Sequence, residues 1–332
     1  MRYFLTGATG FIGHSLSRQL AQAGHEVITT ARRPDRGRLL VELGVEVLPG
    51  DITDKSSMRE AMRGVDGVFH VAAWYKIGAT EKERREAEKI NVDGTRNVLE
   101  LMKELKIRKG VYTSTLAVFS DTHGRLVKEN YRFKGPWLTE YDRTKWKAHY
   151  EVAVPMMEER LPLVIVQPGL VYGPGDTSSV HSMLQLYVRR RLLMTPKKTA
   201  FCWSHVDDTA EAHILAMEKG KPGESYIIAG QIHTLIEAMA IAEKISGIPA
   251  PKRHPGPKMV RFLAGIMYLA GRIVRLPDIY SYEGLRSIAG VTYIGNNEKA
   301  VSELGIPLRP LEEGLRETLE HEKLMLARGK IE

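Results

Sequence analysis

The chain contains almost no cysteine. Cys202 is the only one among 332 residues, which excludes an intrachain disulfide and any metal site built from several thiolates. We therefore predict no metal and a reducing, cytoplasmic location. We also expect no signal peptide, because the first residues already have the pattern of a buried strand.

Long uninterrupted apolar runs are also missing. The most apolar stretch, 259–274, is interrupted by Arg261 and Arg272 and is too short to cross a bilayer. With 43% hydrophobic and 27% charged residues, the composition is that of a globular enzyme. The net charge of +8 favours anionic ligands such as phosphorylated cofactors. No nucleic-acid-binding motif is present, so we expect no nucleic-acid partner.

The first thirteen residues carry the pattern on which the interpretation depends. An apolar run, Tyr3–Leu5, leads into glycines 7, 10 and 13 and then into apolar positions at helical spacing. Strand, glycine-rich turn and helix is the context in which such glycines indicate dinucleotide binding. The phosphates would lie at the N-terminus of the helix, where free N–H groups point at them. We assign to the cofactor site Gly7, Thr9, Gly10, Phe11, Ile12 and Gly13. The spacing is G-x-x-G-x-x-G, and an ordinary glycine turn is the alternative.

The end of the second expected strand, 24–31, indicates which cofactor binds. A site for a free ribose 2′-hydroxyl places Asp or Glu there, whereas a 2′-phosphate favours arginine. Here Arg32 and Arg33 follow Ala31, and no acid is present. A guanidinium matches a phosphate in charge and geometry. We therefore predict NADP(H), with Arg32 as the first contact; a solvated basic turn is the alternative.

Three further strands are expected, at 45–52, 67–73 and 111–118. At the end of the first, Asp51 could accept a hydrogen bond from the adenine amine while Ile52 packs on the ring. Alternatively, Asp51 only starts a turn before a helix capped by Thr53 or Asp54. At the end of the second, Ala72 and Ala73 are small enough to let a cofactor lie across them. His70, within its apolar run, is interpreted as a packed core histidine. A charged helix is expected to run from 81 to 105.

The chemistry is predicted at Tyr141 and Lys145, which share one face of a helix because they are four residues apart. A phenol with a pKa near 10 is a poor acid or base at neutral pH. A neighbouring ammonium would lower that pKa and bring the tyrosine closer to useful proton transfer. Lys145 could also bind the nicotinamide ribose. One hydroxyl, from Ser114 or Thr115, would complete the clamp on a substrate carbonyl.

At this point the chain resembles the extended short-chain dehydrogenase/reductase family, within the NAD-dependent epimerase/dehydratase superfamily. The matching motifs follow in the family's order: 6–13, 50–52, 70–73, 91–95, 113–115, 141–145, 167–176 and 204–213. The resemblance implies that the catalytic hydroxyl falls on Thr115, where the family usually has serine. It implies cofactor contacts at Pro168, Gly169 and Val171, a crossing into a substrate lobe at 167–176, and a return into the sheet at 204–213. The arginine after the second strand and the Ala-Glu-Ala-His helix are most similar to the dihydroflavonol-4-reductase branch.

The expected fold is an α/β doubly wound (Rossmann) parallel sheet with a smaller, chain-discontinuous C-terminal substrate lobe. Residues 1–171 and about 205–230 would bind the cofactor, and about 172–204 and 231–332 would form the lobe. Family resemblance implies a homodimer through helices at 91–105 and 141–159. We expect 259–274 to be a core helix of the lobe, with a substrate lid or a helix at a membrane surface as alternatives. Arg189–Arg191 is expected to be an exposed helix end; the alternative is a diphosphate site.

The predicted function is reduction of a ketone or aldehyde in a small, apolar molecule by NADPH, with Tyr141 as general acid. Two enzymatic alternatives are an NAD-dependent nucleotide-sugar epimerase or dehydratase and a 3β-hydroxysteroid-type dehydrogenase. An alternative of another class is a non-catalytic dinucleotide-binding sensor or scaffold. The hydroxyl, tyrosine and lysine together argue against it, because a sensor does not need an acid–base pair.

Overall fold

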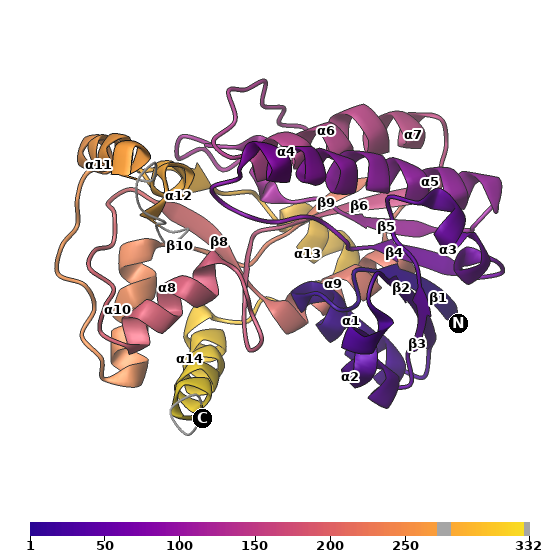
Figure 1. The fold of residues 1–332 in the computed structure, drawn as a ribbon, viewed down its shortest axis with the longest axis horizontal. Helices are drawn as coiled ribbons and strands as arrows, with labels where there is room; N and C mark the ends of the chain where they lie inside the picture. Colours follow the sequence, from indigo (N-terminus) through magenta and orange to yellow (C-terminus); the bar gives the residue numbers. More distant parts are fainter. Residues whose placement is uncertain (271–279, 329–332) are drawn as a thin grey trace.

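The computed structural model describes residues 1–270 and 280–328, and these residues form two sheets joined at the middle of the molecule (Figure 1). The larger sheet has seven parallel strands in the order β3-β2-β1-β4-β5-β6-β9. They are β1 (Arg2–Thr6), β2 (Glu26–Ala31), β3 (Glu46–Pro49), β4 (Gly67–His70), β5 (Gly110–Thr113), β6 (Leu163–Pro168) and β9 (Ser225–Ile228). The strand order reverses between β1 and β4, which opens a crevice at their carboxyl ends. The predicted doubly wound parallel sheet is confirmed.

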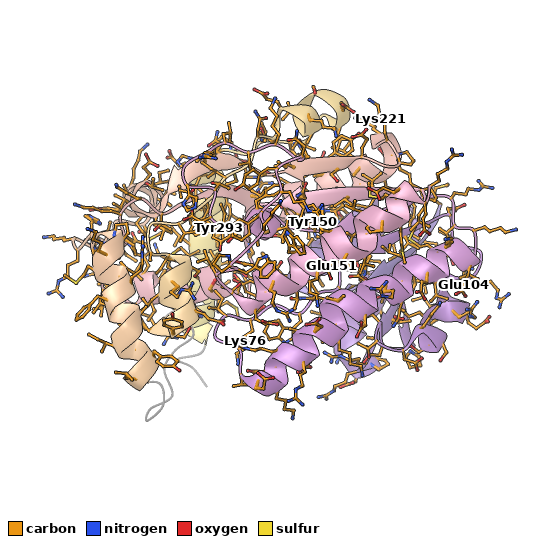
Figure 2. All side chains as sticks on the ribbon, turned by 90° about the horizontal axis from the view of Figure 1, so that it is seen from above. Lys76, Glu104, Tyr150, Glu151, Lys221 and Tyr293 are labelled. Carbon is orange, nitrogen blue, oxygen red and sulfur yellow. The ribbon has the colours of Figure 1, made fainter. Side chains whose placement is uncertain are left out.

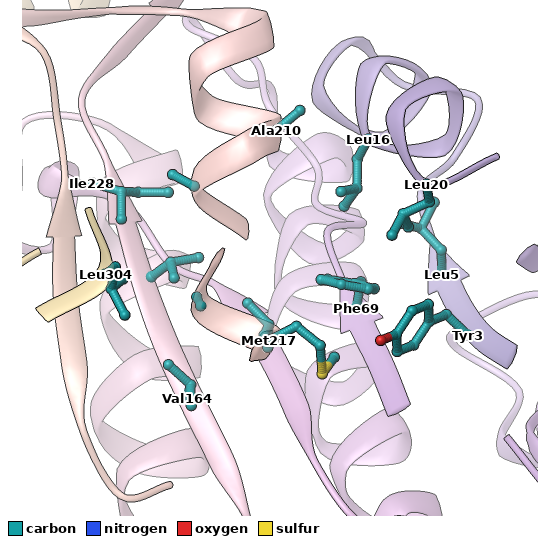
Figure 3. Close-up of a cluster of buried hydrophobic side chains, with 14 of the residues drawn as sticks. Tyr3, Leu5, Leu16, Leu20, Phe69, Val164, Ala210, Met217, Ile228 and Leu304 are labelled. Atoms are coloured by element: carbon teal, nitrogen blue, oxygen red, sulfur yellow. The ribbon is translucent and has the colours of Figure 1, made fainter. Parts of the chain in front are cut away.

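Helices cover both faces of the larger sheet, so its central strands are buried on both sides and read as continuous apolar runs. One face packs against α1 (Phe11–Gln22), α2 (Arg38–Glu42), α9 (Val206–Lys219) and α13 (Glu298–Leu304). Figure 3 shows this core, in which Leu16 and Leu20 of α1 and Met217 of α9 surround Phe69 of β4. The other face packs against α3 (Lys55–Met62), α5 (Gly94–Glu104) and the helix that carries Tyr141. The sheet is therefore a rigid support for whatever lies at its strand ends.

Two long helices lie side by side on that second face (Figure 2). One runs from α4 (Glu81–Glu88) through a π-helical turn at Lys89–Asp93 into α5, which confirms the helix predicted over 81–105. The other runs from α6 (Glu140–Lys147) through a π-helical segment at Ala148–Ala153 into α7 (Val154–Glu158). Glu88 of the first helix pairs with Arg143 and Lys147 of the second.

The smaller sheet is built around β8 (Ala200–His205), which pairs with β7 (Leu170–Tyr172), β10 (Gln231–Thr234) and β11 (Thr292–Tyr293). Its apolar core includes residues of α8 (Ser179–Val188), α10 (Leu235–Ser246) and α14 (Leu311–Arg328). The sequence placed the return to the larger sheet at 204–213, but β8 ends in the smaller sheet and β9 makes the return. Helix α13 packs against α9 and β9 on the larger sheet, whereas the sequence assigned it to the lobe.

Helix α11 (Pro257–Ala270) packs on α12 (Tyr282–Ser287) at one end of the molecule (Figure 1). The stretch predicted as one helix, 259–274, extends beyond the described residues after 270. Val260 and Ala264 are fully buried against α12, whereas the opposite side of α11 is exposed. Within the described part of the chain, no helix is long and apolar enough to cross a membrane.

Candidate active site

A cavity of about 1030 Å³ lies at the carboxyl ends of the parallel strands and extends to the smaller sheet. Every residue predicted for the site lines it: Gly7, Thr9, Gly10, Phe11, Ile12, Gly13, Arg32, Asp51, Ile52, Ala72, Ala73, Ser114, Thr115, Tyr141, Lys145, Pro168, Gly169 and Val171. The strands beneath them are shorter than predicted. β3, β4 and β5 end at Pro49, His70 and Thr113, because the backbone leaves the sheet there and turns along the cavity.

The glycine turn packs too closely for larger side chains. Gly7 has a left-handed backbone with φ +77°, and a Cβ there would lie 2.7 Å from the backbone of Ala72. A Cβ on Gly13 would lie only 2.0 Å from the carbonyl oxygen of Gly7. Gly10 is the N-cap of α1 and supplies no side-chain cap, so the first N–H groups of that helix are available to a ligand. This cradle fits the pyrophosphate of a dinucleotide.

Arg32 follows β2 and lines the cavity with a side chain that is 65% exposed. Its Nη1 lies 3.9 Å from Oε1 of Glu86, which also lines the cavity. Sequence reasoning missed Glu86, because it lies within a charged helical run and has no signal of its own. Arg33 is paired instead with Asp35, at 3.1 Å. Of the two arginines after β2, Arg32 therefore has the longer and weaker ion pair within the chain.

At the end of β3, Asp51 forms the turn that was the alternative to an adenine contact, and the adenine contact stays a prediction. Its Oδ1 accepts a hydrogen bond from the backbone N–H of Thr53 at 2.9 Å, so it forms a turn, and Asp54 caps α3. The same residue lines the cavity beside Ile52, whose side chain packs against the backbone of Gly94. His70 is a core residue, as interpreted. It is hydrogen-bonded to the hydroxyls of Thr6 and Thr95, and burial lowers its pKa to about 3.

Tyr141 and Thr115 both line the cavity, and Thr115 lies close enough to influence the phenol. Burial raises the pKa of Tyr141 above its usual value, and the neighbouring Thr115 hydroxyl offsets only part of that rise. This corrects the prediction that Lys145 lowers the pKa of the phenol. The Nζ of Lys145 instead donates to the carbonyl oxygen of Thr113 at 2.7 Å and to the hydroxyl of Tyr112 at 3.2 Å. Burial also lowers the pKa of Lys145 to about 7, which weakens its positive charge at neutral pH.

The two candidate hydroxyls have different surroundings. The Oγ of Ser114 lies 2.7 Å from Nδ1 of the buried His149, and the two share a hydrogen bond. Thr115 instead caps a 3₁₀ turn over Leu116–Phe119, within the stretch predicted as strand, by accepting from the N–H of Ala117 at 3.1 Å. Of the two hydroxyls, that of Thr115 is the one beside the phenol.

Asp142, next to the catalytic candidate, was not predicted as a site residue. It lines the cavity, and burial raises the pKa of its carboxyl to about 7 despite hydrogen bonds from Thr139 and Tyr293. The hydroxyl of Tyr293 donates to Oδ2 at 3.0 Å. Tyr293 comes from β11, far along the chain, and reaches the middle of the molecule (Figure 2). No local pattern connects the two residues.

Asn91 is a positioning residue that the sequence showed only as part of a motif. It is 1% exposed; its Oδ1 accepts from the N–H of Trp74 at 2.7 Å, and its Nδ2 donates to the hydroxyl of Thr144 at 2.9 Å. It thereby ties the loop after β4 to α6. In that loop, the ring of Tyr75 lies edge-on to Tyr141 with centroids 4.9 Å apart, so the loop helps to hold the phenol.

The lobe side of the cavity is mainly apolar. It includes Leu192, Met194, Phe201, Leu285 and Ile288. Among the described lobe residues that line the cavity, the charged one is Asp176, a buried carboxyl whose pKa is raised by that burial. The three arginines at 189–191 are exposed beyond the end of α8, as expected for a helix end, and they do not line the cavity.

Comparison with known proteins gives the family. Residues 3–229 match the model of the NAD dependent epimerase/dehydratase family. The chain is 30% identical over 325 residues to a protein of Synechocystis sp. that bears the provisional name dihydroflavonol 4-reductase, covering 96% of this chain and 93% of that one. It is 30% identical over 269 residues to sterol demethylase protein B of Methylococcus capsulatus, covering 80% of each. The crystal structure of gox2253 has a TM-score of 0.82 at 27% identity, covering 97% of this chain and 98% of that one. The chain belongs to the NAD dependent epimerase/dehydratase family, a group of extended short-chain dehydrogenases/reductases.

Proposed function

We propose that the protein reduces a ketone or aldehyde carbonyl of a small, apolar molecule, with NADPH as the hydride donor. One observation carries this proposal: Thr115, Tyr141 and Lys145 line the same cavity, and the lobe side of that cavity is mainly apolar. Two relatives have names that refer to a dihydroflavonol and to a sterol, which supports an apolar substrate. When bound, the cofactor supplies the hydride, and the protein supplies position and electrostatics.

The chain's own residues would divide the remaining work. A phenol whose pKa is raised stays protonated at neutral pH, so Tyr141 can donate its proton to the carbonyl oxygen as general acid. Thr115 would donate a hydrogen bond to the same oxygen and orient it. Lys145 holds the end of β5 through the carbonyl of Thr113 and would also contact the ribose. Apolar walls would exclude water from the reacting carbonyl.

NADP, as opposed to NAD, is proposed from the end of β2. Arg32 lines the cavity there, and its pairing with Glu86 is long, at 3.9 Å. A guanidinium with a weak internal partner is suited to a 2′-phosphate. The glycine turn would hold the pyrophosphate, and Asp51 and Ile52 would contact the adenine. The nicotinamide half would be held by the other residues predicted for the cofactor site: Ala72, Ala73, Ser114, Tyr141, Lys145, Pro168, Gly169 and Val171.

The nucleotide-sugar alternative has less support from the cavity. A diphosphate is bound in proteins by arginine, lysine or helix N-termini. In the part of the lobe that the structure describes, the N-terminus of α8 lines the cavity, but the carboxyl of Asp176 lies beside it and would repel a diphosphate, and the arginines at 189–191 do not line the cavity. A 3β-hydroxysteroid-type activity is compatible with the apolar wall and differs from our proposal mainly in direction.

We further propose the division of the chain into residues 1–171 with about 205–230 for the cofactor, and about 172–204 with 231–332, apart from α13, for the substrate. A homodimer through the two long helices, and a cytoplasmic location, also remain predictions.

The experiment is turnover with NADPH on a panel of a dihydroflavonol, a 3-ketosteroid, an aliphatic aldehyde and UDP-glucose. We expect reduction of an apolar carbonyl, and we expect Tyr141→Phe to keep NADPH affinity while turnover falls roughly 100-fold or more. Tyr150→Phe is the matched control, because its phenol donates to the carbonyl of Tyr131 and does not line the cavity. Near wild-type turnover in Tyr141→Phe would refute the role. Epimerised UDP-glucose without NADPH consumption would establish the alternative, and no turnover at all would favour a sensor.

A further inference from the structure

Helix α11 carries an apolar stripe on its outer side. Met259, Phe262, Ile266 and Leu269 are 55%, 66%, 42% and 62% exposed. Their spacing of three, four and three residues places them on one face of the helix. The opposite face, with Val260 and Ala264 fully buried, already packs on α12. The stripe is therefore additional to the packing of the lobe, and large exposed apolar groups arranged in this way indicate a binding surface.

Positive charge surrounds this stripe. Lys252, Arg253, Lys258 and Arg261 are exposed on or just before α11. Residues 244–270 contain no aspartate and no glutamate. A helix with apolar residues on its outer face, basic residues at its flanks and no acidic residues is the pattern of helices that lie in the interface of an anionic lipid bilayer.

We propose that α11 docks this protein on the surface of a membrane that contains anionic lipid. The stripe would enter the boundary between headgroups and acyl chains, and Lys258 and Arg261 would bind lipid phosphates. Figure 1 shows α11 at the extreme end of the molecule, away from α1 and α2, so a flat surface can approach it. This inference does not depend on the proposed reaction, since none of the four stripe residues lines the cavity.

A second copy of the chain is the competing occupant, and the charges argue against it. Pairing α11 with its copy would bring the same four cations of each chain together without an acid from 244–270 to neutralise them. A bilayer with anionic headgroups removes that repulsion and also accepts the apolar side chains. Charge complementarity therefore favours lipid.

The position of α11 also has a consequence for the cavity. Leu285 packs against the buried face of α11 and lines the cavity as well. Through Leu285, the core between α11 and α12 reaches the apolar wall of the cavity. If the proposed function holds, an apolar substrate would have a short path from the bilayer to Tyr141.

The test is co-sedimentation of the full chain with vesicles made of equal parts phosphatidylglycerol and phosphatidylcholine, and with vesicles of phosphatidylcholine alone. We expect binding to the anionic vesicles, weakened by salt. Phe262→Ser with Ile266→Ser should lower the affinity by roughly tenfold or more, and Lys258→Gln with Arg261→Gln by about fivefold for each charge removed. All four side chains are exposed, so circular dichroism should show unchanged folding.

The matched control is Leu39→Ser with Val41→Ser on α2, which removes two apolar side chains that are 63% and 58% exposed; α2 lies at the lower right in Figure 1, well away from α11. This variant should bind vesicles like the wild type. The proposal is overturned if the wild type does not sediment, if anionic lipid makes no difference, or if the control loses as much binding as the stripe variant. It is also overturned if light scattering shows a lipid-free dimer that the stripe variant dissociates.

Discussion

Replacing Gly13 with alanine tests the close contact between α1 and the glycine turn. The new Cβ would lie 2.0 Å from the carbonyl oxygen of Gly7 and 2.7 Å from its carbonyl carbon. These are backbone atoms, which cannot rotate away as a side chain can. Because a carbon–oxygen contact needs roughly 3.3 Å, the helix and the turn must separate by about 1 Å.

The expected change in the free energy of unfolding is the difference between a gain in helix propensity and a cost of overpacking. Alanine in place of glycine within a helix gains about 1 kcal/mol. Overpacking of this severity costs about 3 kcal/mol. We therefore expect Gly13→Ala to lower the free energy of unfolding by about 2 kcal/mol. The same movement displaces the N–H groups that would hold the pyrophosphate, so NADPH affinity should fall by roughly tenfold or more.

The matched control is Gly265→Ala in α11, where an added Cβ meets no atom within 4 Å. Because this glycine is also helical, the same chemical change should raise the free energy of unfolding by about 0.5–1 kcal/mol and leave NADPH affinity unchanged. Urea unfolding and NADPH fluorescence titration measure both quantities. Wild-type stability together with wild-type affinity in Gly13→Ala would refute the reasoning, whatever the control does.

Two further predictions concern cofactor choice and pH. Arg32→Asp should weaken NADPH binding by about 100-fold and NADH binding far less, because a guanidinium–phosphate contact is lost; equal losses in titration would remove the assignment of NADP. Burial lowers the pKa of His70 and His149 to about 3 and of His213 to about 4, so the unfolded state binds more protons below pH 6.5. The free energy of unfolding should therefore fall between pH 6.5 and 4, by up to about 1.4 kcal/mol per pH unit for each histidine. The raised pKa of Asp142 has the opposite effect over this range and offsets the contribution of one histidine. A flat free energy of unfolding in urea over this range would contradict the assignment.

Local sequence patterns were sufficient to predict much of the fold and part of the candidate site. The glycine turn, the arginine after β2 and the four-residue spacing of Tyr141 and Lys145 each lie within a few consecutive residues. Their geometry follows from the periods of strands and helices. The carboxyl ends of parallel strands meet at one edge, so these segments were expected to line one crevice, and the structure brings them to one cavity.

Tertiary structure decided what depends on burial and on contacts between distant segments. Tyr293 meets Asp142 across 151 positions of the chain, and Glu86 meets Arg32, without any signal in the sequence around either pair. The pKa of Tyr141 moves upward, opposite to the prediction, because surrounding protein atoms remove water from the phenol and Lys145 donates to β5 instead. Spacing determines which side chains can share a face. How much water and which partners those side chains keep is determined only when the whole chain has packed.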